Sequence, residues 1–539
     1  MVPRSWKTLS LYCMLMDAIL HGNGQTRDSH YIECVRNGLL SNEGFNRSVA
    51  YVRAWMAYAD PSTGLIPKNI RESSDFWNAW DAAADNYPFM VLTSSVLMPD
   101  FFRDTAAKML RMEKRLTSRI GRLPDTYSFS SRGFRNARPD SGQILFGAAE
   151  YMKDGLVPLT EWLGKSAWSR RMLGILEDVP RIGRMATNIK GEWFGNSIIE
   201  ETNGDLLQVL SRMYWFTGRR RYLDWAVDIA DTYLNEKGLP TRSLDRLRLR
   251  DHGCEIVSGL CEAYLAAAFA WPEKREKWRP YIHEMLDRIL EAGRNGDGLF
   301  YDEFNPLSGK VLKERIADNF GYTLNAYWFV YLLDRKPEYR DAVIKALSSL
   351  NQRYRGHDWE SGSADGYADA IEGALNLFNR ERLQSVQEWL DSEIKVLWRF
   401  QKPEGMVEGW HGDGNFARTN MMYCLWKTQG VTADRWDPQL HLGASETEDG
   451  IRLLLSHPSG WKGKLLFDTK RHRDKLHMPF DYPRINQFPE WLTIEPKLSY
   501  LVTDIGSGTI RSYKGRQLAS GLRTSVEGGK DLYLAIRRK

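Results

Sequence analysis

Apolar positions between about residues 43 and 428 recur at helical spacing, in pairs of segments joined by short polar or glycine-containing turns. In RRRYLDWAVDIADTYL, the positions Tyr222, Ala226, Ile229 and Tyr233 share one helical face. The pattern predicts helix pairs over 80–97 with 100–118, 140–153 with 158–180, 201–217 with 219–235, 252–270 with 275–293, 318–333 with 337–350, and 364–378 with 382–398. A last helix is expected over 414–428.

The pairs follow one another every ~45 to 60 residues, a spacing typical of an α-solenoid or of a closed helical toroid. Two features favour closure. The first helix of each pair is apolar around most of its circumference, as expected of an inner ring covered by an outer one. Long connections rich in aromatic residues and glycine, at 123–142 and 295–315, suit the walls of a cleft. The predicted fold class is therefore mainly α, an (α/α)6-type helical toroid of six or seven hairpins.

The pattern changes after about residue 440. The segments GIRLLLSHPSGWKGKLLFD and KDLYLAIRRK contain short apolar or alternating runs bounded by Gly, Pro and Asp. Leu532, Leu534 and Ile536 occupy alternate positions, as on one face of a strand. We therefore predict a toroid catalytic domain over 1–435 and a smaller β-rich domain over 440–539.

Charge and composition narrow the class of protein. The net charge of the 539-residue chain is +5, and its Lys and Arg are dispersed, which gives no nucleic-acid footprint. Its five Cys lie far apart without a CxxC pair, which argues against a structural zinc site or a disulfide framework. No stretch reaches the roughly 20 apolar residues of a membrane span. LSLYCMLMDAIL near the start resembles a signal-peptide core but contains Asp17, so cytoplasmic and exported locations both stay open.

Polar residues form stripes at the starts of the apolar helices, where core positions are otherwise expected. Their spacing of three and four puts each stripe on one helical face. The stripes are Asp81 and Asp85; Glu201, Asp205, Gln208 and Arg212; Asp251, Glu255, Ser258 and Glu262; Asp318, Tyr322 and Asn325; Asp365, Asp369, Glu372 and Asn376; and His411, Asn415 and Arg418. A solvated outer face would explain any one stripe, and the helix dipole favours acids at helix starts. In a closed ring, the stripes would instead converge on one mouth.

A carboxylate-rich mouth suits the cleavage of glycosidic bonds. One carboxyl group donates a proton to the leaving oxygen, while another activates water or stabilises the sugar cation. Partial burial and nearby like charges raise the pKa of one carboxyl group, so that it keeps its proton near neutrality. Aromatic residues make up 12% of the chain, and flat rings suit stacking on sugars. This chemistry needs no cofactor and no catalytic metal.

The segment GDLLQVLSRMYWFTGRRRYLDWAVDIADTYL, residues 204–234, resembles the central hairpin of unsaturated glucuronyl hydrolases and related six-hairpin glycosidases. The resemblance implies that Asp205 is the general acid/base. It also implies a second Asp on an earlier inner helix, for which Asp85 in AWDAAADNYPF is the nearest counterpart and Asp81 its rival. The family's Arg-Gly-Gln-Ala-Trp-type stretch is replaced by residues 251–255, within the helix start at 249–267. This departure favours hydrolysis of a saturated glycoside such as a glucuronide.

The sequence therefore predicts a glycoside hydrolase that releases a terminal uronic acid from an oligo- or polysaccharide. Asp205 is the expected general acid, with Asp85 or Glu255 as its partner. Substrate contacts are expected from Trp80, Asp81, Glu201, Asp251, His252, Tyr322, Asp365, Trp410, His411 and Arg418. Two alternatives remain: a uronate lyase whose base is Tyr322 or Tyr87 with His252 or His411, and a glycan-binding protein without catalysis. The sequence leaves the oligomeric state open.

Overall fold

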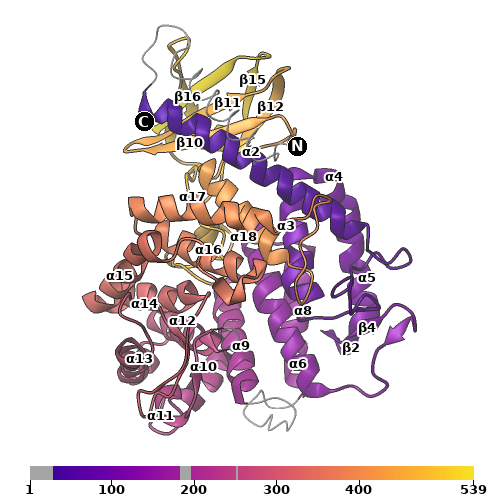
Figure 1. Cartoon of the computed structure of the whole chain (residues 1–539), viewed down its shortest axis with the longest axis vertical. Coiled ribbons are helices and arrows are strands. Elements are labelled where there is room, and N and C mark those ends of the chain that lie inside the picture. Colours follow the sequence, from indigo (N-terminus) through magenta and orange to yellow (C-terminus); the bar gives the residue numbers. More distant parts are fainter. Residues whose placement is uncertain (1–27, 183–195, 251–252) are drawn as a thin grey trace, which may run out of the picture. The chain divides into compact units, whose positions relative to one another are not determined.

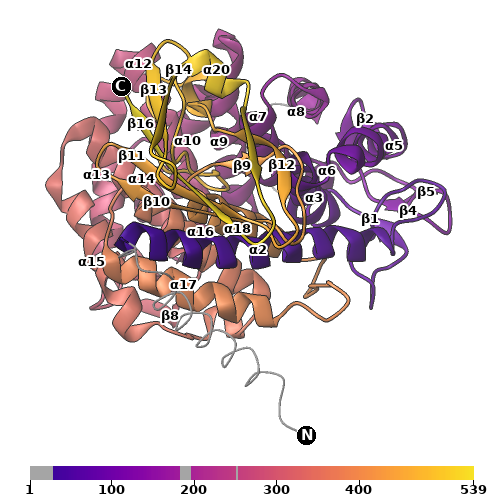
Figure 2. The same cartoon turned by 90° about the horizontal axis from the view of Figure 1, so that it is seen from above.

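The computed structural model describes residues 28–182, 196–250 and 253–539. Contacts within the chain define two compact units, and neither is continuous in sequence. The helical unit comprises 47–423 and 470–490, and the β unit comprises the residues up to 46 together with 424–469 and 491–539. Two helices, α2 (Ser29–Met56) and α18 (Gly414–Lys427), have residues in both units, and Figure 2 draws α2 as one unbroken helix.

Helices dominate the helical unit and follow one another in pairs (Figure 1). The first pair joins η1 (Ala82–Asn86) and α3 (Tyr87–Leu97) to α4 (Pro99–Phe101), η2 (Phe102–Ala106) and α5 (Ala107–Thr117). Later pairs are α9 (Asn196–Thr217) with α10 (Arg220–Tyr233), α12 (Cys254–Ala270) with α13 (Pro272–Ala292), α14 (Phe320–Asp334) with α15 (Pro337–Arg353), and α16 (Ala364–Phe378) with α17 (Gln384–Arg399). The mainly helical composition, with larger sheets toward the C-terminus, confirms that part of the expected fold class.

The second pair departs from the expectation. The letters KDGLVP predicted a turn between 153 and 158, because Asp-Gly and Pro usually mark turns. Instead α6 (Ser141–Glu150) continues through the π-helical segment η3 (Tyr151–Leu156) into α7 (Val157–Leu163). The turn comes at Gly164, whose φ is +68°, before α8 (Ala167–Asp178). All of η3 is buried, so packing overrides the local turn signal and puts Asp154 on a first helix.

The first helices of successive pairs contact one another. α6 contacts α9, α9 contacts α12, α12 contacts α14, and α14 contacts α16, while η1 contacts η3. α18 meets both ends of this series. The Thr419 hydroxyl donates to the carbonyl of Ala368 on α16 at 2.9 Å, and Gly414 lies against the backbone of Asp85 in η1. The series of contacts therefore returns to its first pair.

Facing glycines allow α14 and α16 to approach closely. A Cβ atom on Gly321 would lie 2.4 Å from the Cα of Gly373, which is closer than real side chains come. The close approach lets the hydroxyl of Tyr322 on α14 donate to Glu372 Oε2 on α16 at 2.5 Å. Polar residues of the two stripes thus meet inside the helical unit.

Short elements occupy the connections of the helical unit. They are β1 (Phe76–Trp77), β4 (Tyr127–Ser128) and β5 (Gly133–Phe134); β2 (Ser118–Ile120) and β3 (Leu123–Pro124); β6 (Leu247–Arg248), β7 (Tyr301–Phe304) and β8 (Val311–Ile316); and the single turns η4 (Val179–Ile182), α11 (Pro240–Ser243), η5 (Trp359–Ser361) and α19 (Arg471–Asp474). None of the helices in the described ranges is both long and apolar enough to cross a bilayer.

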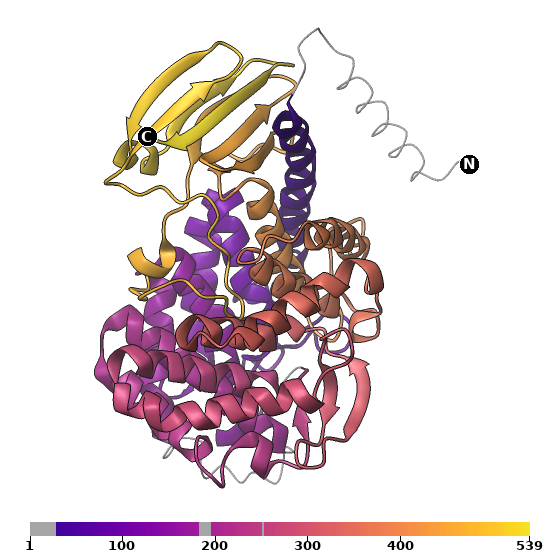
Figure 3. The same ribbon diagram turned by 90° about the vertical axis from the view of Figure 1, so that its left-hand side faces the viewer.

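Two antiparallel sheets form the β unit, and Figure 3 shows their strands in yellow and orange. The five-stranded sheet has the order β10-β11-β16-β13-β14, and the three-stranded sheet has the order β15-β12-β9. The strands are β9 (Thr432–Ala433), β10 (His441–Thr447), β11 (Gly450–Ser456), β12 (Trp461–Leu466), β13 (Ser499–Asp504), β14 (Thr509–Lys514), β15 (Leu522–Val526) and β16 (Asp531–Arg538), with the short helix α20 (Gly515–Ala519). Leu534 and Ile536, expected on one strand face, lie in the buried core.

Candidate active site

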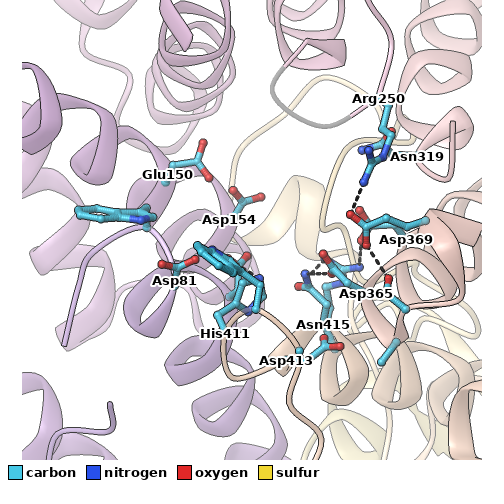
Figure 4. A pocket seen from close by; sticks show the side chains of 18 of the residues that line it. Asp81, Glu150, Asp154, Arg250, Asn319, Asp365, Asp369, His411, Asp413 and Asn415 are labelled. Carbon is cyan, nitrogen blue, oxygen red and sulfur yellow. Dashed lines mark hydrogen bonds and ion pairs between the residues drawn. The ribbon is translucent and has the colours of Figure 1, made fainter. Parts of the chain in front are cut away.

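A cavity of about 870 Å³ opens in the helical unit. Its volume suits a small ligand or one end of a glycan. The lining comes from the starts of first helices and from the long connections. Figure 4 shows Asp81, Glu150 and Asp154 on one side, Asp365, Asp369 and Asn415 on the other, and His411 and Asp413 on a loop between them. Carboxyl groups from segments far apart in sequence therefore face one space.

Most of the site residues expected from the sequence line this cavity. They are Trp80, Asp81, Asp85, Glu201, Glu255, Tyr322, Asp365, Trp410, His411 and Arg418. Asp251 and His252 lie outside the described residues. Asp205 does not line the cavity, because its side chain is fully buried beside Lys153. Burial of Asp205, Gln208 and Glu372 also rules out the solvated-face explanation for their two stripes.

Lys153 is the centre of one carboxylate cluster. Its Nζ lies 2.8 Å from Asp154 Oδ1, 2.8 Å from Glu255 Oε1 and 3.7 Å from Asp205 Oδ1. Burial disfavours the ammonium form, but these carboxylates outweigh that effect and hold the pKa of Lys153 well above its usual value. Burial, followed by the charges of Asp205 and other acids, raises the pKa of Glu150 well above its usual range. The cluster thus combines a fixed ammonium with at least one protonated carboxyl group.

Two π-helical segments carry Asp85 and Asp154. Asp85 lies in η1, Asp154 lies in η3, and the two segments pack against each other. Gly155 permits this contact, because a Cβ there would lie 2.5 Å from Pro88 Cγ and 3.0 Å from the carbonyl oxygen of Ala83. π-Helical turns within α-helices recur at functional sites.

Asp85 is only partly exposed, with 17% of its side-chain surface accessible. Burial raises its pKa well above the usual range, and the nearby charges of Asp154 and then Asp81 add to the effect. At the same time, two donors converge on Oδ1 of Asp154: Lys153 Nζ at 2.8 Å and Asn486 Nδ2 at 2.7 Å. The pair therefore offers a protonated acid beside a carboxylate with two donors.

Asp81 and His411 complete the Asp85 side of the cavity. Asn78 donates to Asp81 at 2.5 Å, and Lys68 Nζ lies 3.3 Å from the same oxygen. His411 Nε2 lies 3.9 Å from Asp85 Oδ2. Burial lowers the pKa of His411, but Asp81, Asp365 and other acids outweigh it and raise the pKa above the usual value. A protonated His411 therefore neutralises part of this acidic wall.

Arg418 organises the opposite wall. Its Nη2 donates to Asp369 Oδ1 at 2.6 Å and lies 3.2 Å from Glu372 Oε2, while its Nη1 donates to Asn415 at 2.8 Å. The Tyr322 hydroxyl, which donates to Glu372, also lies 2.9 Å from Asp369 Oδ1. Arg418 thus pairs with both carboxyl groups of this wall.

Two further acids, Asp365 and Asp413, line the cavity near this network. Asn415 Nδ2 donates to Asp365 Oδ1 at 2.6 Å. Burial raises the pKa of Asp365 well above its usual range, and Asp369 and Asp413 add to the effect. Burial raises the pKa of Asp413 to about 6, against the opposing charge of His411. Burial and neighbouring acids therefore favour the protonated form of Asp365, as they do for Glu150 and Asp85.

Several lining residues were not among the expected site residues. They are Glu150, Lys153, Asp154, Arg250, Arg315, Asn319, Glu360, Asp369, Glu408, Asp413 and Asn415. Asp369 and Asn415 belong to stripes already noted. The DG and GDG letters around Asp154 and Asp413 look like ordinary turns, so sequence alone gave no reason to choose them.

Comparisons with known proteins give likeness of fold only. No protein-family model matches the chain, and no curated protein matches it. Similar solved structures include an inactive alpha-1,6-mannanase from Salegentibacter sp. HEL1_6 with alpha-1,6-mannotetrose, at 10% identity and a TM-score of 0.39, which covers 71% of this chain and 98% of that one. Cellobiose 2-epimerase from Bacillus thermoamylovorans is 12% identical, with a TM-score of 0.35 and coverages of 53% and 86%. These structures belong to the six-hairpin (α/α) toroid class.

Proposed function

We propose that this protein is a glycoside hydrolase, with Asp85 and Asp154 as its catalytic carboxyl groups. The observation that carries the proposal is the packing of η1 on η3, which brings a partly exposed acid with a raised pKa beside a carboxyl group held by donors. We also infer that the helical unit is a closed (α/α) toroid. The contacts of α18 with both ends of the helix series support closure.

Each carboxyl group has a role that follows from its surroundings. Burial and the neighbouring acids raise the pKa of Asp85 and favour its protonated form, so it suits donation to the leaving glycosidic oxygen. Asp154 accepts from Lys153 and Asn486, so it suits activation of water or stabilisation of the sugar cation. The exposed ring of Trp410, 71% accessible with Lys68 Nζ 4.0 Å from its centre, offers a flat surface at the mouth for sugar stacking.

Asp205, the acid implied by the sequence resemblance, has a different position. It has no accessible surface, and Lys153 and Glu255 lie near it in the cluster. Burial raises its pKa well above the usual range, and the charge of Lys153 opposes this rise, so the two groups are electrostatically coupled. On these contacts we assign Asp205 and Glu255 to holding Lys153 rather than to proton transfer.

The charge of the cavity indicates whether the bound sugar is neutral or acidic. Acidic lining residues outnumber Lys and Arg by more than two to one, and the basic ones have acidic partners. Burial favours the protonated forms of Asp85, Glu150 and Asp365, but the remaining lining acids still outnumber Lys and Arg, so a substrate carboxylate would meet net repulsion. The charge favours a neutral glycoside, while a terminal uronic acid, expected from the sequence, is the second candidate. Arg250 and Arg315, which line the cavity, are the groups that would receive its carboxylate.

The contacts argue against a lyase. The Tyr322 hydroxyl lies within hydrogen-bonding distance of two carboxyl groups, and burial raises its pKa well above the usual value, so it resists becoming a base. The acids around His411 raise its pKa above the usual value and so favour the protonated imidazole, which cannot accept a proton from the substrate. Tyr87 donates to the carbonyl of Ala106 and accepts from Trp168, so its hydroxyl is already engaged.

The proposal is tested by comparing three isosteric variants on a panel of neutral and uronate-containing glycans. Asp85→Asn and Asp154→Asn should each lower kcat by about 10²- to 10⁴-fold, the usual effect of losing an acid or base. Asp205→Asn should retain more activity than either. Released reducing sugar measures hydrolysis. A rise in ultraviolet absorbance measures elimination, because elimination creates a double bond in the sugar.

Asp231→Asn is the matched control, because Asp231 pairs with Lys274 and Trp278 on the outer helices α10 and α13. It should leave kcat unchanged. Full activity of Asp85→Asn would overturn the assignment of the acid. New double bonds would overturn hydrolysis altogether, and binding without turnover in the wild-type protein would favour the glycan-binding alternative.

A further inference from the structure

The segment 470–490 interrupts the β unit and packs entirely within the helical unit; we call it the strap. Its ends are held together in the β unit, where Asp468 and Thr493 form a bridge and Ile494 donates to the carbonyl of Asp468 at 2.9 Å. Among strap residues, Asn486 is 1% exposed and has a φ of +59°, a left-handed conformation that Asn tolerates better than most residues.

Asn486 joins both walls of the cavity. Its Nδ2 donates to Asp154 Oδ1 at 2.7 Å, and its Oδ1 accepts from Arg418 Nη1 at 2.8 Å. Its backbone N–H donates to Glu372 Oε1 at 2.7 Å. Asp154 and Arg418 line the cavity, whereas Asn486 lies behind them. One side-chain amide thus fixes the distance between a proposed catalytic carboxylate and the arginine opposite.

The chemistry of the amide matches the two partners. A carboxylate needs a donor and a guanidinium needs an acceptor, and the planar amide of Asn presents both without a change of protonation. A carboxylate at this position would keep the bond to Arg418 but would face Asp154 with a second acceptor. A buried pair of that kind shares a proton up to higher pH.

The neighbouring contacts of the strap hold Asn486 in place. Arg484 forms an ion pair with Glu161 and donates to Asp481 at 3.0 Å. Arg212 donates to the carbonyl of Ile485 at 3.2 Å, and Tyr482 donates to Glu262 at 3.1 Å. The residues that directly precede Asn486 are therefore anchored to buried charges of the helical unit.

We propose that Asn486 is a positioning residue of the active site: through its amide, the strap orients Asp154 and Arg418 for catalysis. The inference rests on the proposed function, because Asp154 acts there as the catalytic carboxylate. It adds a residue from the C-terminal part of the chain to a site otherwise built between residues 80 and 418.

The test compares Asn486→Asp with Gln487→Glu in the full-length protein. Both exchange a buried amide for a carboxylate beside an existing Asp, since Gln487 Nε2 donates to Asp481 at 2.9 Å. Asn486→Asp should lower kcat at least tenfold at neutral pH, change KM less than threefold, and move the acidic limb of the pH–rate profile upward by about one pH unit. Gln487→Glu should leave the profile where it is in the wild-type protein.

A second readout separates this inference from the proposed function. Asn486→Gly removes the amide while accepting the left-handed backbone, and crystal structures should show Asp154 or Arg418 displaced by more than ~1 Å. An unchanged pH profile in Asn486→Asp, or unmoved side chains in Asn486→Gly, would overturn the positioning role. If the wild-type protein cleaves no glycan, the proposed function fails and the displacement alone decides the role of Asn486.

Discussion

At the scale of the residue, Glu372 shows how burial and charge oppose each other in this site. Burial raises its pKa to about 7, although Arg418 favours the charged form and hydrogen bonds from Tyr322 and the Asn486 backbone do the same. A group with one firm ion pair therefore still keeps its proton near neutrality. Desolvation is the stronger effect wherever several acids share few cations.

This pKa has a consequence for stability. Because the folded-state pKa of about 7 exceeds the ordinary 4.5, the folded protein binds the proton more tightly between these values. The contribution of Glu372 to the free energy of unfolding is then fully present below about pH 4.5 and is lost as the pH rises toward 7. Relative to Glu372→Gln, the free energy of unfolding of the wild-type protein should fall by ~3 kcal/mol across this window.

Denaturant unfolding at several pH values measures the difference. Glu276→Gln, an exposed change on the outer helix α13, is the control and should give a curve parallel to that of the wild-type protein. A constant gap between wild type and Glu372→Gln from pH 4.5 to 7 would contradict the prediction.

Sequence could identify many single residues of the site but not their order of importance. Asp81, Asp85, Asp365 and Arg418 stood out because polar groups interrupt apolar helices. Which of these residues are buried, and which acid each Lys or Arg pairs with, depends on which helices contact one another. Helical periodicity does not predict those contacts. This is why Asp205 looked exposed at a mouth when it lies beside Lys153, out of contact with the cavity.

At the scale of the element, helical periodicity predicted most pairs to within a few residues, as in α9 with α10 and α14 with α15. The predicted turn at KDGLVP was wrong: the segment is buried, and its packing keeps it helical although its residues usually favour a turn. A π-helical turn carries one residue more than an α-helical turn, so it shifts side chains onto a new face. The shift places Asp154 on the cavity wall, a position that the α-helical period does not give.

The contact between η1 and η3 leads to a prediction for Gly155→Ala. The new Cβ would collide with the carbonyl of Ala83, which lies in η1 with Asp85, and with Pro88 in α3, the helix that follows η1. We expect stability to fall by ~1–3 kcal/mol, as for other overpacked cores, and kcat to fall because Asp85 and Asp154 move apart. Thermal unfolding and initial rates measure the two effects.

Gly174→Ala is the matched control in an outer helix. There the nearest atoms belong to the flexible side chain of Arg122, with Cδ at 3.3 Å, and Ala favours helix over Gly. The control should be neutral or slightly stabilised, with normal activity. Normal activity in Gly155→Ala as well would mean that the close approach of η1 and η3 does not set the catalytic geometry.

At the scale of the whole molecule, the strap supplies partners from the C-terminal part of the sequence to buried residues from its N-terminal half, such as Glu161. A cut of the sequence near residue 435 would remove Arg484, whose guanidinium lies fully buried against Glu161, and would leave that carboxylate without its partner. Loss of one member of a buried ion pair costs about 3–5 kcal/mol. Sequence patterns show no regular element in the strap, but they do not show that it belongs to the helical unit while its flanking segments belong to the β unit.

The strap can be tested by itself because its ends are bridged at Asp468 and Thr493. Replacing residues 471–490 with a short Gly-Ser linker should leave the β unit intact, since a few residues close that gap. Glu161, Glu262 and Glu372 would lose buried partners, so the helical unit should unfold at a lower temperature and lose activity. Calorimetry should resolve two transitions, with only one shifted. A single transition shifted as a whole would mean that the units unfold together, and unchanged activity would mean that the cavity is complete without the strap.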